Sequence, residues 1–199
     1  MWTGLVLAGG RSSRMGRDKA LIRLGGRTLL ERAIELVRSA GGTPVIVGPP
    51  RPEAALAGVT RVDDAEGDGE PAGPLAALRC GLVATGAPRV VALGCDLPLL
   101  TPAFLALLVR ESEHADAVVP ECGGTRHVLA AAYARACLAA IEGRLARGER
   151  ALHAILPEVR TRILREADLA ECGGPDIFLN VNTPGDLERA RAILEGERG

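Results

Sequence analysis

The sequence predicts an α/β protein built on an open, mainly parallel sheet. Short apolar runs with strand character alternate along the chain with segments whose apolar residues recur at helical spacing. Strands and helices that alternate in this way form parallel strands with helices packed on the sheet. A chain of 199 residues is long enough for one domain with a substantial core, so we expect residues 1–199 to form a single domain.

The first elements have clear local signals. Residues 5–7 form an apolar run that predicts the first strand. Thr28 is a good N-cap and Glu31 completes a capping box three residues later, so a helix is expected to run from there to the glycine pair 41–42. A second strand at 44–47 follows directly.

The next segment changes character twice. The cluster Pro49-Pro50-Arg51-Pro52 predicts a rigid loop within the domain rather than a domain boundary. Residues 59–62 predict a short third strand that ends at Asp63-Asp64, and the acidic, glycine-containing stretch through Glu70 is expected to be a mobile loop.

The remaining elements follow from the same two periodicities. Helices are expected from Pro74 to Gly86 and from Thr101-Pro102 to about Glu113, on either side of a central strand at 90–93. Further strands are predicted at 116–120, 126–133 and 160–163, and further helices at 135–147, at 149–156 and from Thr183-Pro184 onward.

A glycine-rich, cationic turn directly follows the first strand. Its sequence is L-A-G-G-R-S-S-R-M-G-R-D-K, residues 7–19. Gly9 and Gly10 lack a Cβ, so backbone N–H groups there can approach phosphate oxygens. Charged donors are added by Arg11, Arg14, Arg17 and Lys19. Neither G-x-G-x-x-G nor G-x-x-x-x-G-K-[ST] is present, which argues against a dinucleotide fingerprint and against a Walker-type loop.

This signature resembles that of nucleotidyltransferases, and among them the molybdenum cofactor guanylyltransferases. Three later blocks are similar to that family in the same order: G-P-L-A-A-L from Gly73, G-C-D-L-P-L-L from Gly94 and F-L-N-V-N-T-P-G-D-L from Phe178. The resemblance implies a Rossmann-like three-layer sandwich of the nucleotide-diphospho-sugar transferase type, with a mainly parallel sheet and one antiparallel strand. It also implies an activity: transfer of GMP from GTP to molybdenum-molybdopterin. This reaction releases pyrophosphate and forms the molybdopterin guanine dinucleotide cofactor.

Asp96 is the first choice as a ligand for magnesium (Mg²⁺), because it follows a buried strand and magnesium prefers carboxylate oxygens. The alternative for Asp96 is a cap on the following turn. Lys19 is assigned to the phosphates because a flexible point charge can follow them during transfer, with Arg14 as a second candidate. Arg11 and Arg17 are equally well explained as solvated surface residues.

The resemblance distributes the binding roles along the chain. The nucleotide is expected to contact the following residues: Leu7, Ala8, Gly9, Gly10, Lys19, Asp64 and Asp96. Asp63 is the alternative to Asp64. Asn180, Asn182 and His127 are the candidates for acceptor binding; the asparagines could instead form a turn before the last helix, and His127 could be an ordinary strand residue.

Other functions stay open on sequence alone. Within the class, the alternatives are a molybdopterin cytidylyltransferase and a sugar-phosphate nucleotidyltransferase; outside it, the alternative is a non-enzymatic nucleotide-binding module. The pair Gly9-Gly10 favours guanine, because the cytidylyl relatives typically have alanine at the first position. Val128 stands where the family usually has proline, which leaves the acceptor open. Other molybdenum cofactor biosynthesis or acceptor proteins are expected among the partners.

Composition excludes several classes. A net charge of −1 favours neither nucleic acid nor a membrane surface as a partner, and no apolar run reaches the roughly 18 residues of a membrane span. The start of the chain has no signal-peptide pattern, so we expect a cytoplasmic protein. The five cysteines form no C-x-x-C pair, which argues against a zinc site or a disulfide framework, and Cys95 has no evident activating histidine.

Overall fold

The computed structural model describes residues 2–9, 18–51, 56, 58–64 and 73–196. Its main sheet has the strand order β10-β7-β9-β6-β1-β4-β5, and a short strand β8 pairs with β7. The strands are β1 (Trp2–Leu7), β4 (Gly42–Val47), β5 (Thr60–Val62), β6 (Arg89–Gly94), β7 (Ala117–Cys122), β8 (Thr125–Arg126), β9 (Ala130–Ala134) and β10 (Thr161–Leu164). A separate hairpin consists of β2 (Arg23–Leu24) and β3 (Arg27–Thr28).

The sheet is mainly parallel. Pairs β1–β4, β1–β6, β4–β5 and β7–β10 are parallel, whereas β9 is antiparallel to both of its neighbours, β6 and β7. The predicted mainly parallel sheet with one antiparallel strand is therefore confirmed for the seven strands of the order given above. The short strand β8 is a further antiparallel strand, paired with β7.

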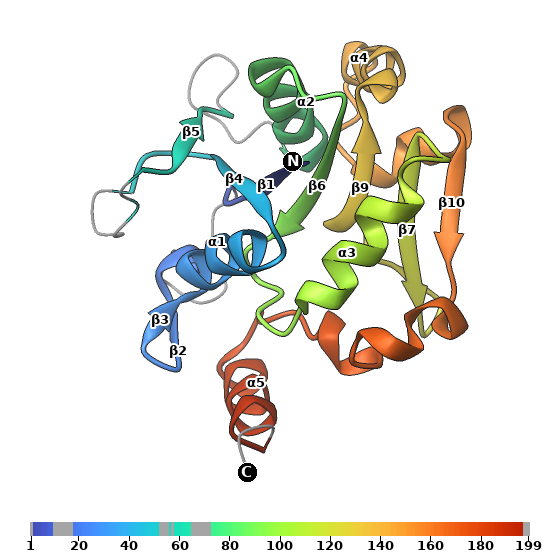
Figure 1. Ribbon diagram of the computed structural model, residues 1–199. Coiled ribbons are helices and arrows are strands. Elements are labelled where there is room, and N and C mark those ends of the chain that lie inside the picture. The colour runs from blue at the N-terminus through green and yellow to red at the C-terminus, as the bar shows by residue number, and fades with distance from the viewer. Residues whose placement is uncertain (1, 10–17, 52–55, 57, 65–72, 197–199) are drawn as a thin grey trace.

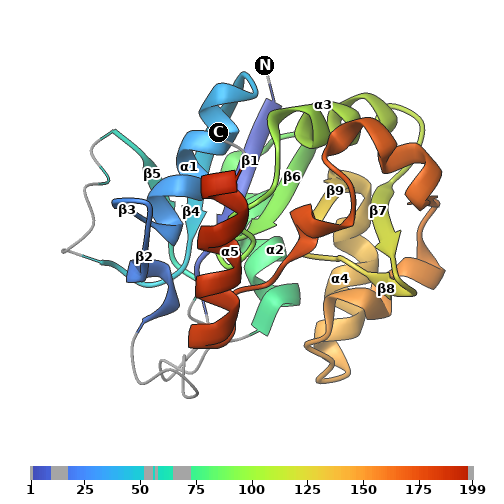
Figure 2. The same ribbon diagram turned by 90° about the horizontal axis from the view of Figure 1, so that it is seen from below.

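Helices cover both faces of the sheet. The five α-helices are α1 (Leu29–Ser39), α2 (Gly73–Thr85), α3 (Pro102–Glu111), α4 (Leu138–Ala146) and α5 (Pro184–Gly196). Helices α1 and α3 lie on one face, and α2 and α4 lie on the other (Figures 1 and 2). Because strand side chains alternate between faces, Val6 packs with the core under α1 and α3, while Leu5 and Leu7 pack with the core against α2. This is the expected three-layer sandwich.

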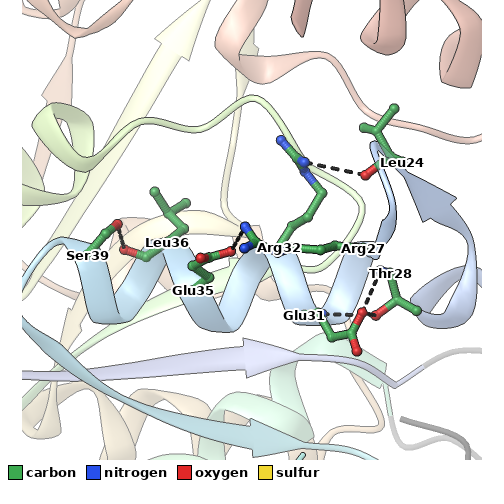
Figure 3. Close-up of polar contacts among 8 residues, drawn as sticks. All are labelled: Leu24, Arg27, Thr28, Glu31, Arg32, Glu35, Leu36 and Ser39. Atoms are coloured by element: carbon green, nitrogen blue, oxygen red, sulfur yellow. Dashed lines mark hydrogen bonds and ion pairs between the residues drawn. The ribbon is translucent and has the colours of Figure 1, made fainter. Parts of the chain in front are cut away.

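Helix α1 begins where its capping signals predict (Figure 3). The Thr28 hydroxyl accepts a hydrogen bond from the Glu31 N–H at 3.1 Å, and the Glu31 carboxylate accepts from the Thr28 N–H at 2.7 Å. The carboxylate also accepts from the Thr28 hydroxyl at 2.9 Å, and the two hydrogen bonds that it accepts lower the pKa of Glu31, since they favour its charged form. The helix ends at Ser39, and Gly41 then takes a φ of +79°, which glycine adopts without strain.

Helix α5 packs away from the two main cores. Its Ala190 is fully buried with Leu24 of the hairpin, Leu29 of α1, Leu99 and Val181. In Figure 2 α5 lies in front of the middle of the sheet, with the hairpin on its left, and Figure 1 shows it beyond the lower ends of the central strands. This small third core brings the segment before α5 close to the carboxyl ends of β1 and β6.

Two predicted elements were wrong in part. The helix expected at 149–156 is instead a 3₁₀-helix, η3 (Leu152–Glu158), which contains Pro157; proline has no N–H for an α-helical ladder. The strand expected at 126–133 is interrupted at 127–129, where the chain makes a turn and the Ala130 N–H donates to the His127 carbonyl at 3.0 Å.

Other differences concern short elements. Helix α4 is preceded by the 3₁₀-helix η2 (Arg135–Cys137), so the α-helical part begins later than expected. The 3₁₀-helices η1 (Lys19–Leu21), η4 (Glu166–Cys172) and η5 (Pro175–Phe178) and the β2–β3 hairpin were not predicted. The expected loop through Glu70 lies largely outside the described residues. Over the described part of the chain, the helices are too short or too polar to cross a bilayer.

Candidate active site

A cavity of about 240 Å³ opens at the carboxyl ends of β1 and β6. These strands are neighbours, and the strand order reverses between them: the chain passes from β1 to β4 and β5 on one side, then returns to β6 on the other. Ligands of open α/β sheets bind in such a crevice. The cavity is lined by Leu7, Ala8, Gly9, Asp18, Lys19, Ala20, Asp64, Gly73, Pro74, Ala77, Gly94, Cys95, Asp96 and Leu129.

Gly9 and Asp64 form one wall of the cavity. Asp64 is only 7% exposed, and a Cβ on Gly9 would lie 2.2 Å from its Oδ2 atom, so only glycine leaves that carboxylate in place. Burial raises the pKa of Asp64, while the nearby charges of Arg51 and Arg61 oppose that shift. Asp63 is exposed and pairs with Arg61 at 3.3 Å, so of the two aspartates it is Asp64 that faces the cavity.

Lys19 and Asp96 also line the cavity, and Asn182 contacts Lys19 without lining the cavity itself. The Lys19 Nζ lies 3.6 Å from the Asp96 Oδ2 and donates a hydrogen bond to the Asn182 Oδ1. The Lys19 and Asp96 side chains are 22% and 21% exposed, so the pair is shielded from bulk water but open to the cavity. A cation and a carboxylate therefore face the same space from two different elements.

The position of Asn182 is set by its backbone. The Val181 N–H donates to the Asp96 carbonyl at 2.9 Å, which joins this segment to the end of β6. The Asp186 carboxylate accepts from the N–H groups of Asn182 and Thr183 at 3.0 and 2.8 Å, and these hydrogen bonds lower its pKa. The turn before α5 is thus capped by Asp186, and the Asn182 side chain stays available to Lys19.

Asn180 and His127 do not line the cavity. Asn180 is exposed. His127 lies outside the strands, half-buried, with its ring stacked on Phe178 at 4.2 Å, and burial lowers its pKa. The stack joins the β8–β9 connection to the segment that leads to Asn182, but contact of either residue with an acceptor stays a prediction.

Several predicted residues lie outside the described part of the chain, namely Gly10, Arg11, Arg14 and Arg17. Their assignments stay predictions. Cys95, in contrast, is buried in the cavity wall, and burial together with the neighbouring Asp96 raises its pKa to about 12. The thiol is therefore neutral near pH 7, as expected for a packing residue rather than a nucleophile.

Sequence reasoning missed three residues around the site. Asp18 lines the cavity and its carboxylate accepts from the Ala20 N–H at 3.0 Å. Arg51 is buried behind it and pairs with Asp18 at 2.6 Å, and Asp186 caps the Asn182 turn. Only Asp186 had a sequence signal, since an acidic residue three positions after Thr183 is typical of a helix start.

The family model of the MobA-like NTP transferase domain matches residues 4–163. The chain belongs to the MobA-like NTP transferase family. Three of the four blocks that carried the resemblance lie within the matched residues, whereas the fourth, from Phe178, follows them. The predicted nucleotidyltransferase class is confirmed.

Individual MobA-like relatives agree with this. A protein of Opitutus terrae named probable molybdenum cofactor guanylyltransferase is 38% identical over 94% of this chain and 94% of its own length. One of Desulfosudis oleivorans named molybdenum cofactor guanylyltransferase is 33% identical over 98% of this chain and 97% of its own length. The structure of molybdopterin-guanine dinucleotide biosynthesis protein A from Archaeoglobus fulgidus has the same fold, with a TM-score of 0.81 at 24% identity over 98% of this chain and 99% of that one.

Proposed function

We propose that this protein is a magnesium-dependent guanylyltransferase that transfers GMP from GTP to molybdenum-molybdopterin and releases pyrophosphate. The main support is the cavity at the β1/β6 crevice, which Lys19, Asp96, Gly9 and Asp64 line together. It presents a cation for phosphates, a carboxylate for a divalent ion and a buried carboxylate for a base or ribose. The names of the full-length relatives support the choice of GTP and the pterin.

The residues of the cavity fit a magnesium ion bound together with a substrate. Within the described ranges, no group of three or more histidine, cysteine, aspartate or glutamate side chains could hold a metal alone. Magnesium commonly takes one or two carboxylates and completes its shell with phosphates and water. Asp96 would hold the ion, which when bound neutralises charge on the triphosphate and on the leaving pyrophosphate.

The side chains of this protein have separate tasks in the transfer. Lys19 binds the phosphates, and Arg14 is a second candidate for that task. Asp64 accepts hydrogen bonds from guanine N1 and N2 or from the ribose. Asn182 orients the acceptor, with Asn180 and His127 as further candidates.

The terminal phosphate of the acceptor attacks the α-phosphorus in line. A new P–O bond forms as the bond to the β-phosphate oxygen breaks, and pyrophosphate leaves with that electron pair. The protein supplies position and charge, so no covalent nucleophile is needed.

The nucleotide assignment is tested by thermal shift. A ligand that binds only the native state raises the melting temperature according to its affinity. With magnesium present, we expect GTP to raise the melting temperature more than ATP, CTP or UTP at equal concentration. The largest shift with CTP would instead support a cytidylyltransferase, and equal shifts would remove the guanine assignment.

Gly9→Ala tests the wall formed with Asp64. The new Cβ would lie 2.2 Å from the Asp64 Oδ2, so the carboxylate must move away from its place in the cavity. We expect GTP affinity to fall about tenfold, the loss of roughly 1.4 kcal/mol, with little change in melting temperature.

Gly143→Ala in α4 is the matched control for that variant, because the nearest atom to its Cβ would be 3.8 Å away. It should bind GTP like the wild type. If Gly9→Ala also binds GTP like the wild type, Asp64 has no part in holding the nucleotide.

A further inference from the structure

The Arg51 side chain is buried although it lies in a loop. The side chain is 5% exposed. Its guanidinium donates to the Asp18 carboxylate, to the Ala8 carbonyl and to the Pro49 carbonyl of its own loop. The Nε lies 2.6 Å from the Asp18 Oδ2 and the Nη2 lies 3.4 Å from the Asp18 Oδ1. The Nη2 also donates to the Ala8 carbonyl, and the Nη1 donates to the Pro49 carbonyl at 3.2 Å.

Such a buried cation needs its partners, because an unpaired charge in a protein interior is costly. Lysine carries the same charge, but it lacks the planar fork that reaches a carboxylate through two nitrogens and a carbonyl at the same time. The contacts of Arg51 therefore fix Asp18 against the end of β1, where Ala8 and Gly9 line the cavity.

Asp18 in turn fixes the backbone turn that carries Lys19. Its Oδ1 accepts from the Ala20 N–H at 3.0 Å and so caps η1, the turn that begins with Lys19. From this turn the Lys19 ammonium reaches Asp96 at 3.6 Å and the Asn182 side chain. A continuous series of contacts thus runs from Arg51 through Asp18 to the cation that faces the cavity.

We propose that Arg51 is a positioning residue for nucleotide binding: it holds Asp18, and Asp18 orients the turn that presents Lys19 to the phosphates. The inference rests on the proposed function in that Lys19 must bind the nucleotide. Arg51 does not line the cavity, so it acts through Lys19 rather than by touching the substrate.

A double-mutant cycle separates this role from a general effect on stability. We measure the dissociation constant of the nucleotide that the wild type binds most tightly, with magnesium, for Arg51→Met, Lys19→Ala and the double variant. We expect Arg51→Met to weaken binding at least about tenfold in the wild-type background and less than about threefold in the Lys19→Ala background, since residues in one network are not additive.

Arg89→Met is the matched control. Arg89 also donates to two backbone carbonyls, those of Ser112 and Glu113, but it stands at the first residue of β6, at the other end of the strand from the cavity. It should bind the nucleotide within about twofold of the wild type. Arg51→Lys should lie between Arg51→Met and the wild type, because it keeps the charge and one contact.

The outcomes are distinct. An equal loss from Arg51→Met in both backgrounds, or no loss in either, would overturn the inference. If Arg51→Met does not fold, Arg51→Lys and Asp18→Asn enter the same cycle. A preference for CTP over GTP would contradict the proposed function, but the role of Arg51 would still be tested with CTP as the nucleotide. A wild type that binds none of the four nucleotides would overturn both the proposed function and the role of Arg51.

Discussion

Asp96→Asn is expected to keep the fold and to lose turnover by about a hundredfold or more, the scale of one preorganised electrostatic contact in a transition state. The substitution keeps the shape of the side chain and removes its charge. The backbone carbonyl of Asp96, which accepts from the Val181 N–H at 2.9 Å, is unchanged, so the link to the segment before α5 should persist. Pyrophosphate release at several magnesium concentrations measures the loss.

Asp63→Asn serves as the control for that substitution. It removes a carboxylate from the same end of the sheet, but Asp63 is exposed and pairs with Arg61 at 3.3 Å outside the cavity. Turnover should stay near that of the wild type. Near-normal turnover of Asp96→Asn at limiting magnesium would show that the metal is held elsewhere.

Lys19→Ala is expected to weaken GTP binding and to lower turnover together. A hydrogen bond to a charged group contributes roughly 1.5–3 kcal/mol, so we expect a loss of about tenfold to a hundredfold in GTP affinity. The ammonium faces the cavity beside Asp96, so its removal affects the bound nucleotide and the transfer alike. Equilibrium binding and single-turnover kinetics measure both quantities.

Asn182→Ala provides the contrast. Lys19 still has Asp96 within 3.6 Å, so GTP affinity should stay within a few-fold while turnover with the acceptor falls. The Asp186 cap uses the backbone N–H of residue 182, which alanine retains, so stability should change little. A fully active Asn182→Ala protein would remove Asn182 from the site, and normal GTP binding by Lys19→Ala would remove Lys19 from the phosphates.

Local signals predicted much of the fold. The capping box at Thr28 and Glu31 and the apolar run of β6 were confirmed because neighbouring residues alone decide them. The interruption at 127–129 was not predictable, since the residues on its two sides pair with different parts of the sheet: β8 with the end of β7, and β9 with β6 and the start of β7. The turn at η3 likewise depends on tertiary packing of Leu152 and Ile155.

The site was predictable where polar residues directly follow strands. Asp64 and Asp96 follow β5 and β6, and parallel strands bring their carboxyl ends together. Arg51 carried no such signal: among prolines it looks like a surface arginine, and its role depends on Asp18 and Ala8, which lie 33 and 43 positions away. His127 was assigned by family resemblance; its ring stacks on Phe178 at 4.2 Å, and its contact with an acceptor stays a prediction.

The contact between Lys19 and Asn182 joins residues 163 positions apart. Closing so long a loop carries an entropic cost that grows only slowly with length, and contacts of such separation are typical of slower folding. Helix α5 packs in a small apolar cluster with the hairpin and the start of α1, apart from the two larger cores, so we expect it to open more readily than the sheet. A substrate that contacts both Lys19 and Asn182 is therefore expected to couple substrate binding to the docking of α5. Docked α5 would raise the affinity for the substrate, and bound substrate would stabilise the docked helix to the same extent.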